Sequence, residues 1–147
     1  MIYKALFSFM GLMAISMASF AADNEADELM GIWLNHEKDA HVKVYKCGDE
    51  YCGKIVWLKE PEEDGAPKLD KNNPDESLQS RTIKGLDILS GFHFDSDRKW
   101  EDGTIYNPRD GKTYSCYLKI LEDGRLKVRG FVGISIIGKT NYWTRIE

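Results

Sequence analysis

Closely spaced turn signals limit this chain to short structural elements. Asp and Gly tolerate the positive φ angles that tight hairpin turns require, and the dipeptide Asp-Gly occurs four times. The runs between these breaks are rich in Val, Ile, Tyr, Trp and Thr, and none has the pattern of a long amphipathic helix. Short strands at near-regular spacing predict an all-β sandwich or barrel. The turn signals are Asp-Gly at 64–65, 102–103, 110–111 and 123–124, with Gly48-Asp49 and Gly138-Lys139.

Alternation within the first three runs supports a β-meander. If four-residue loops join these runs, Val44 faces Ile55, Val42 faces Trp57, and Trp33 faces Val44. Directly opposed residues lie on the same side of a sheet, so these five residues form one apolar face. The strands are expected over residues 31–36, 41–47, 52–58, 83–94, 99–106, 113–121, 125–132 and 139–146.

A charged segment and a helix start interrupt the strands after residue 59. Asn73 suits an N-cap, Pro74 the first helical position and Glu76 the reciprocal capping position, which predicts a short helix over residues 74–79. Oxygen-bearing side chains from Asp70 onward also begin like a calcium loop. Because Pro74 stands where an EF-hand ligand belongs, loop capping is the better interpretation.

The first 21 residues have the layout of a secretory signal peptide. Lys4 precedes an apolar run over residues 5–17, and Ser19-Phe20-Ala21 matches a small-x-small cleavage site. The alternative, an uncleaved membrane anchor, needs about 20 apolar residues. We expect an exported protein without a stable membrane span after cleavage. The domains are then a signal peptide at 1–21, a flexible leader at 22–30, and one β-barrel domain at 31–147.

Length and charge exclude some functions. The chain has 147 residues and a formal net charge of −4, which fits one domain. Nucleic acid is not an expected partner, because a phosphate-binding face normally carries clustered Lys and Arg.

The three cysteines have different expected fates. Cys47 and Cys52 lie opposite each other in the expected hairpin, and an exported protein permits oxidation, so we predict a disulfide that staples the hairpin. A redox switch is the alternative, but the spacing is not Cys-x-x-Cys. Cys116 lies on the apolar face of its strand, where a buried free thiol is commoner than a nucleophile.

Other polar groups do not complete a catalytic or metal site in the sequence. His36 and His41, with Glu37 or Asp39, could bind zinc or copper, but no second cluster closes the site. A carboxylate pair for glycoside hydrolysis needs a defined separation, and charged loops are usually solvated. We therefore assign no catalytic residue, metal or cofactor. The acids of these charged loops are Glu60, Glu62, Glu63, Asp64, Glu101 and Asp102.

Six short motifs occur in a distinctive order and spacing. They are Gly31-x-Trp33, Cys52-Gly53-x-Ile55, Asp70-x-Asn72-x-Pro74-Asp75, Gly103-x-Ile105-Tyr106-x-Pro108, Asp110-Gly111-x-x-Tyr114 and Trp143-x-Arg145. Together they resemble a family of small exported bacterial proteins, the domain of unknown function 2147. The resemblance covers nearly all of residues 31–146 and implies a lipocalin-like barrel.

The ends of the barrel sequence are also similar to the lipocalin pattern. There an arginine packs over a tryptophan of the first strand and helps to close one end, which implies this role for Gly31, Trp33 and Arg145. Such a cation–π contact contributes about 0.5–2 kcal/mol. We expect an all-β fold, an antiparallel lipocalin-like β-barrel of about 8–10 strands with one short helix in a loop.

The expected function is non-enzymatic binding in a bacterial envelope, in the periplasm or, alternatively, after secretion. A small apolar ligand would occupy a cavity at one barrel end. The alternative is a structural or interaction module that binds an envelope protein or glycan through Trp100, Tyr106 and loop 60–64. An enzyme, the third possibility, needs a perturbed acid, His or Cys beside a pocket. The expected cavity lining is Trp33, Trp57, Tyr114, Leu118 and Val128.

Overall fold

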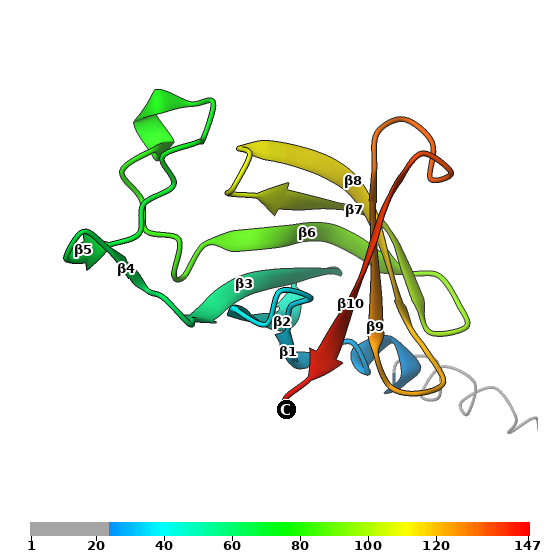
Figure 1. Ribbon diagram of the computed structural model, residues 1–147. Helices are drawn as coiled ribbons and strands as arrows, with labels where there is room; N and C mark the ends of the chain where they lie inside the picture. Colours follow the sequence, from blue (N-terminus) through cyan, green and yellow to red (C-terminus); the bar gives the residue numbers. More distant parts are fainter. Residues whose placement is uncertain (1–23) are drawn as a thin grey trace, which may run out of the picture.

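The computed structural model describes residues 24–147, so the signal peptide expected at residues 1–21 lies outside the described part. Eight described strands form one closed antiparallel barrel (Figure 1), which confirms the all-β prediction. No helix within residues 24–147 has the length and apolar composition needed to cross a membrane. The barrel strands are β1 (Gly31–Leu34), β2 (Ala40–Cys47), β3 (Glu50–Leu58), β6 (Asp87–Phe94), β7 (Lys99–Asn107), β8 (Lys112–Ile120), β9 (Leu126–Phe131) and β10 (Gly138–Arg145).

Each barrel strand pairs with the next one along the chain, and β10 returns to pair with β1. In such an up-and-down barrel the connections alternate between the two ends. We call one end the mouth; it carries the connecting segments 35–39, 59–86, 108–111 and 132–137. We call the opposite end the floor. Segment 59–86 is the longest connection and holds the small hairpin of β4 (Glu62–Glu63) and β5 (Ala66–Pro67) and the 3₁₀ turn η1 (Glu76–Leu78).

The β2–β3 hairpin is tighter than the alternation predicts. Cys47 pairs with Glu50, so two residues form the turn in place of the expected four, and Gly48 adopts a φ of 68°. The register therefore moves by two residues, which leaves the side chains from this turn to Ile55 on their predicted side because the side-chain period is two. Cys47 and Cys52 become diagonal neighbours with 5.9 Å between their Cα atoms, and the structure confirms their disulfide.

Trp57 lies on the outer face, against expectation. A register shift between His41 and Val42 pairs Val42 with Ile55 but His41 with Trp57, which places one extra residue on β3. This bulge turns Trp57 outward, where it is 39% exposed and its ring centroid lies 4.4 Å from that of His41. The prediction that Trp57 shares the inner face is therefore wrong.

The floor half of the barrel is filled by large side chains. Trp33, Trp100 and Leu118 are fully buried, and Phe92 lies against Gly103, where an added Cβ would approach its ring to 2.4 Å. The expectation that Trp100 forms part of an exposed aromatic surface is therefore wrong. Its strand alternation points it into the barrel.

Residues 24–30 cover the floor, in contrast to the flexible leader expected from their acidic composition. Leu29 is fully buried, and its carbonyl accepts a hydrogen bond from Nε1 of Trp33 at 3.0 Å. The carbonyl of Ala26 accepts one from Nε1 of Trp100 at 3.1 Å. A buried indole N–H needs a hydrogen-bond acceptor, and the carbonyl groups of this segment provide one for each of the two tryptophans that fill the floor.

Arg145 closes the barrel where the last strand meets the first. Trp33 pairs with Arg145 across β1 and β10, and the guanidinium carbon lies 4.2 Å from the centroid of the Trp33 ring. The same guanidinium donates to the carbonyl of Met30 at 2.9 Å and to that of Glu28. Gly31 makes room for it: φ is 132°, and an added Cβ would lie 2.8 Å from Nη1 of Arg145.

We expect Gly31→Ala to destabilise the fold more than Gly124→Ala. Both glycines have positive φ, but an added Cβ at Gly31 also lies 2.2 Å from the carbonyl oxygen of Glu147, whereas nothing lies within 4 Å at Gly124. The steric difference is worth about 1–3 kcal/mol. Urea unfolding of both variants measures it. Equal losses would show that only the backbone angle matters at Gly31.

Candidate functional site

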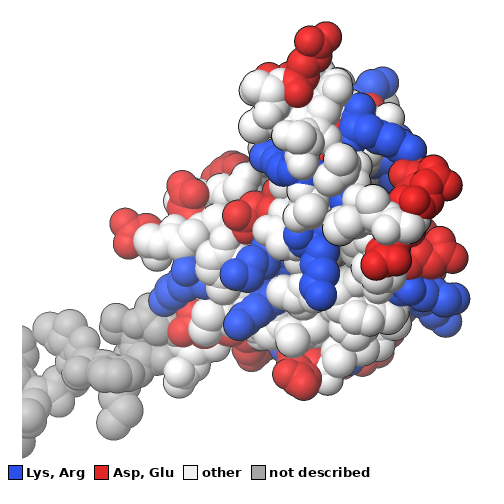
Figure 2. Space-filling model, turned by 90° about the vertical axis from the view of Figure 1, so that its left-hand side faces the viewer, with Lys and Arg blue, Asp and Glu red and all other residues white. Residues whose placement is uncertain are grey.

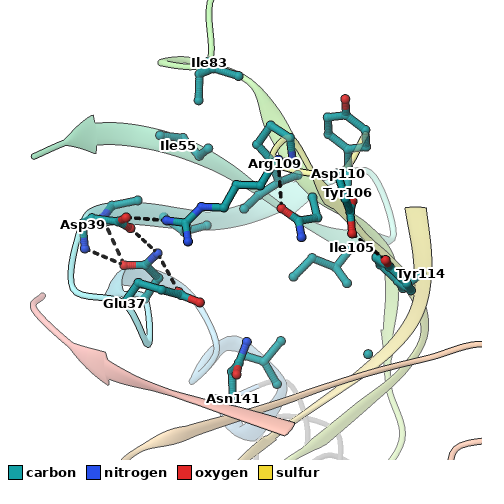
Figure 3. A pocket seen from close by; sticks show the side chains of 18 of the residues that line it. Glu37, Asp39, Ile55, Ile83, Ile105, Tyr106, Arg109, Asp110, Tyr114 and Asn141 are labelled. Atoms are coloured by element: carbon teal, nitrogen blue, oxygen red, sulfur yellow. Dashed lines mark hydrogen bonds and ion pairs between the residues drawn. The ribbon is translucent and has the colours of Figure 1, made fainter. Parts of the chain in front are cut away.

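A cavity of about 1060 Å³ opens at the mouth of the barrel (Figure 3). Its volume is at the upper end of the range for small-molecule sites, about 300–1,000 Å³. The mouth loops supply most of the charged side chains, whereas the barrel strands supply a largely apolar wall. That wall consists mainly of Val42, Ile55, Ile88, Ile105, Val128 and Trp143.

The expected lining residues divide between three places. Tyr114 and Val128 line the cavity. Trp33 and Leu118 lie in the filled floor half, where both are fully buried. Trp57 lies outside the barrel because of the β3 bulge. Alternation predicts which side of a strand faces inward, but it carries no information on depth along the barrel axis.

Sequence reasoning missed two features of the cavity wall. Gly130 leaves space inside it, because an added Cβ would make only ordinary contacts, 3.7 Å from Ile105 and 3.8 Å from Tyr114. The amide of Asn141 is directed toward the cavity (Figure 3) and has no hydrogen-bond partner among the described residues. The inward positions of β9 and β10 were the available signal for both, since each lies two residues from an inward apolar neighbour.

Segment 59–86 is pinned to the barrel by a buried carboxylate. Asp70 is fully buried and accepts hydrogen bonds from the hydroxyl of Tyr106 at 2.6 Å and from Nδ2 of Asn73 at 2.9 Å. Arg81 adds an ion pair at 3.0 Å. Burial, followed by the hydrogen bond to Asp70, raises the pKa of the Tyr106 hydroxyl to about 12. Tyr106 is therefore a structural anchor, not the exposed surface aromatic that we expected.

A second contact fixes the same segment to the β7–β8 turn. Nδ2 of Asn72 donates to the carbonyls of Pro108 and Arg109, each at 3.1 Å. Gly111 permits this approach, since an added Cβ would lie 1.8 Å from the carbonyl oxygen of Asn72. The motif residues around Asp70, Tyr106 and Gly111 thus meet in space and hold one rim of the mouth.

The predicted helix over residues 74–79 is shorter, and its cap differs. Only Glu76–Leu78 form a 3₁₀ turn, and Asp75 is the N-cap, with its side chain accepting from the amide of Ser77 at 3.0 Å. Asn73 instead accepts from the amide of Asp75 and binds Asp70. The capping assignment to Asn73 is therefore wrong, because its amide is used to satisfy a buried carboxylate.

The other sequence candidates lie outside the cavity or are occupied. Burial raises the pKa of the Cys116 thiol to about 12, so this cysteine stays protonated at neutral pH. His36 is exposed and His41 stacks on Trp57. Glu101 forms an ion pair with Lys99 at 2.6 Å. Within residues 24–147, no three His, Cys, Asp or Glu side chains come together as a metal site.

An ion pair crosses the mouth. The guanidinium of Arg109, from the β7–β8 turn, reaches the carboxylate of Asp39 in the β1–β2 loop (Figure 3). Asp39 also accepts from Nδ2 of Asn35 at 2.7 Å. In the same β7–β8 turn as Arg109, Asp110 accepts a hydrogen bond at 2.6 Å from the hydroxyl of Tyr114, which raises the pKa of the tyrosine.

Comparison with known proteins places these features in a family and a fold. Residues 31–145 match the family described as "Uncharacterized protein conserved in bacteria" (DUF2147). A solved structure, protein HP1028 from the human pathogen Helicobacter pylori, is 28% identical with a TM-score of 0.71 and is described as belonging to the lipocalin family. The similarity covers 81% of this chain and 83% of that chain. No curated protein matches the sequence.

We expect Tyr106→Phe to loosen segment 59–86. Loss of a hydrogen bond to the buried Asp70 carboxylate should cost about 1.5–3 kcal/mol at neutral pH. The raised pKa also means that wild-type stability falls as pH rises from the ordinary tyrosine value of 10.0 toward about 12, and the variant should lose that part of the fall. Urea unfolding across this pH range measures both effects.

Tyr45→Phe is the matched control. Its hydroxyl also donates to an aspartate, Asp87, at 2.6 Å, but this pair is exposed. It should cost less than about 1 kcal/mol and leave segment 59–86 as resistant to proteolysis as in the wild type. An equal effect of both variants would contradict the anchoring role of Tyr106.

Proposed function

Since the chain belongs to the DUF2147 family of uncharacterized bacterial proteins, we propose that it is a lipocalin-like carrier that binds one small, largely apolar molecule in its cavity. The observation that carries this proposal is a barrel filled at one end and hollow at the other. Protein interiors are normally packed without voids larger than a water molecule. The cavity of about 1060 Å³ far exceeds such a void.

The wall of the cavity favours an apolar occupant. Val42, Ile55, Ile88, Ile105, Val128 and Trp143 give the strands an apolar wall, whereas the acids of the lining come from the mouth segments. Burial of apolar surface is worth roughly 25 cal/mol per Å², so covering this wall with a ligand is favourable. The proposed role is therefore binding of an apolar molecule. Membership of the similar H. pylori protein in the lipocalin family supports the same role.

Export to the periplasm, or secretion, is part of the proposal. It rests on the signal-peptide layout of residues 1–21 and on the Cys47–Cys52 disulfide, which an oxidising compartment favours. Residues 24–30, which cover the floor, lie after the expected cleavage site at Ala21.

A second candidate function is an interaction module of the envelope. One observation favours it: loop 132–137, at the mouth, exposes Val132, Ile134, Ile136 and Ile137, which are 59–78% accessible. Arg129 holds this loop by donating to the carbonyls of Ser135 and Ile136. Four exposed aliphatic side chains on one loop are typical of a contact surface for another protein.

Filling the cavity tests the carrier proposal. Gly130→Leu should reduce binding of a neutral fluorescent probe, N-phenylnaphthylamine, by about ten-fold or more, because the new side chain projects into the cavity without a backbone clash. Fluorescence titration measures the affinity, and urea unfolding verifies that the variant folds.

Lys43→Leu is the matched control for this experiment. It introduces the same side chain on β2, where Lys43 is exposed and does not line the cavity. Probe affinity should stay at the wild-type value. Wild-type protein that never takes up the probe, or a Gly130→Leu variant that binds it equally well, would contradict the carrier role.

A photo-crosslinking residue at Ile136 tests the interaction module. We expect a discrete cross-linked protein when the residue is at Ile136 but not when it is at Glu122, which lies in the β8–β9 turn at the floor. Identical products from both positions in the source bacterium would indicate random collisions and contradict a contact through loop 132–137.

A further inference from the structure

The loop that joins β9 and β10 carries an apolar tip. Its side chains Val132, Ile134, Ile136 and Ile137 are the four most exposed large apolar side chains of the described residues. In Figure 1 this loop stands at the end of the β9–β10 hairpin, apart from segment 59–86. A soluble protein rarely gathers exposed apolar side chains in this way unless another surface covers them.

The backbone of the tip is already hydrogen-bonded within the protein. The carbonyls of Val132 and Ile134 accept from amides of the loop itself, each at 3.1 Å. The guanidinium of Arg129 donates to the carbonyl of Ser135 at 2.8 Å and to that of Ile136 at 3.2 Å. Backbone groups that move from water into lipid must be bonded internally, because hydrocarbon offers no partner, whereas a contacting protein can supply one. The bonding of this loop therefore favours a lipid surface over a protein surface.

The hairpin that carries the tip is basic. Residues 124–146 contain five Lys and Arg and no Asp or Glu. Arg129 and Lys139 flank the tip, and Lys139 is exposed without an ionic partner among the described residues. The neighbouring connections 35–39 and 108–111 carry charges of both signs, and so does the face on which β4 and β5 lie (Figure 2). Anionic headgroups attract basic residues close to a membrane, so the charge of this hairpin is complementary to them.

We infer that loop 132–137 docks the protein on an anionic phospholipid membrane. The aliphatic tip enters the interfacial region of the bilayer, and Lys139 lies at the level of the headgroups. The loop thereby gains a lipid partner in place of the protein partner of the second candidate function. Val132 and Ile137 also line the cavity, so docking turns the mouth of the barrel toward the membrane. The docking itself does not depend on whether the cavity is occupied.

Sedimentation with lipid vesicles tests this inference. The protein used is the chain from residue 22, which keeps all described residues and lacks the apolar run over residues 5–17 that would itself bind lipid. We expect it to sediment with vesicles of phosphatidylethanolamine and phosphatidylglycerol, and to bind vesicles of phosphatidylcholine about five-fold more weakly. High salt should reduce this difference, because the basic groups are exposed.

One substitution at the tip assigns the binding to the loop. Ile136→Asp should weaken vesicle binding about ten-fold or more, because it places a charge where the apolar tip enters the lipid. Ile136 is 78% exposed and does not line the cavity, so affinity for N-phenylnaphthylamine should stay at the wild-type value. Urea unfolding verifies that the variant folds.

Ile146→Asp is the matched control. It makes the same change of side chain and charge at an exposed isoleucine, but Ile146 follows β10 at the floor. Because the floor lies far from the membrane in the docked protein, this variant should change vesicle binding by less than about two-fold.

An environment-sensitive label shows which end of the barrel enters the lipid. Nitrobenzoxadiazole is attached to a thiol introduced by Ser135→Cys at the tip or by Glu122→Cys in the β8–β9 turn at the floor, both exposed positions. Cys116 is buried, and Cys47 and Cys52 are bonded to each other, so the native cysteines do not compete for the label. We expect vesicles to increase the fluorescence of the label at the tip and to leave that of the label at the floor unchanged.

Several results would overturn membrane docking. One is wild-type protein that stays in the supernatant with both kinds of vesicle. Ile136→Asp that binds as well as wild type, or a label that responds equally at both ends, would place the contact elsewhere on the molecule. Equal binding to both kinds of vesicle would overturn the choice of an anionic surface. A discrete protein cross-linked at Ile136, without vesicle binding, would assign the loop to a protein partner.

The same measurements separate docking from the carrier function. Protein that binds N-phenylnaphthylamine but no vesicles would overturn the docking and leave the carrier function in place. Protein that binds vesicles through the tip but never takes up the probe would support the docking and contradict the carrier function.

Discussion

The contact between Arg145 and Trp33 is the constraint on which the barrel depends. It lies over the seam where the backbone of β10 pairs with that of β1, a pairing that leaves neither strand as an open edge. One guanidinium covers the indole ring and also binds the carbonyl of Met30. Because Gly31 lacks a side chain, these groups approach closely. Closure at the floor leaves the cavity at the opposite end of the barrel.

The two ends of the barrel have different physical tasks. At the floor, Trp33 and Trp100 fill the interior, and residues 24–30 accept their indole N–H groups. At the mouth, the strands line the cavity with aliphatic side chains. The hydrogen bond between Asp70 and Tyr106 anchors the long segment 59–86 to the barrel. The buried carboxylate of Asp70 is fully hydrogen-bonded, whereas the ion pair of Arg109 with Asp39 at the rim is exposed to water.

Strand positions were predictable because turn residues and alternation are local properties. All eight barrel strands occur close to the expected ranges. The predicted disulfide forms even though the β2–β3 register differs from the prediction by two residues. Trp57 shows the limit: one bulged residue reverses its direction, and nothing in the run around it signals the bulge. Arg109 shows another limit. A charged residue in a turn is predicted to be solvated, and only the position of the opposite loop reveals that it pairs with Asp39.

The amino-acid sequence alone determined the class of fold, the strands, the pairing of Cys47 with Cys52 and, apart from Trp57 and Trp100, the side of the strand that points inward. These follow from turn chemistry and from the two-residue period of a strand. Only the tertiary structure decided which inward residues fill the floor and which line a cavity, and that Arg109 meets Asp39 across the mouth. Depth along a barrel axis and contacts between loops depend on strand stagger and closure, which local patterns do not encode.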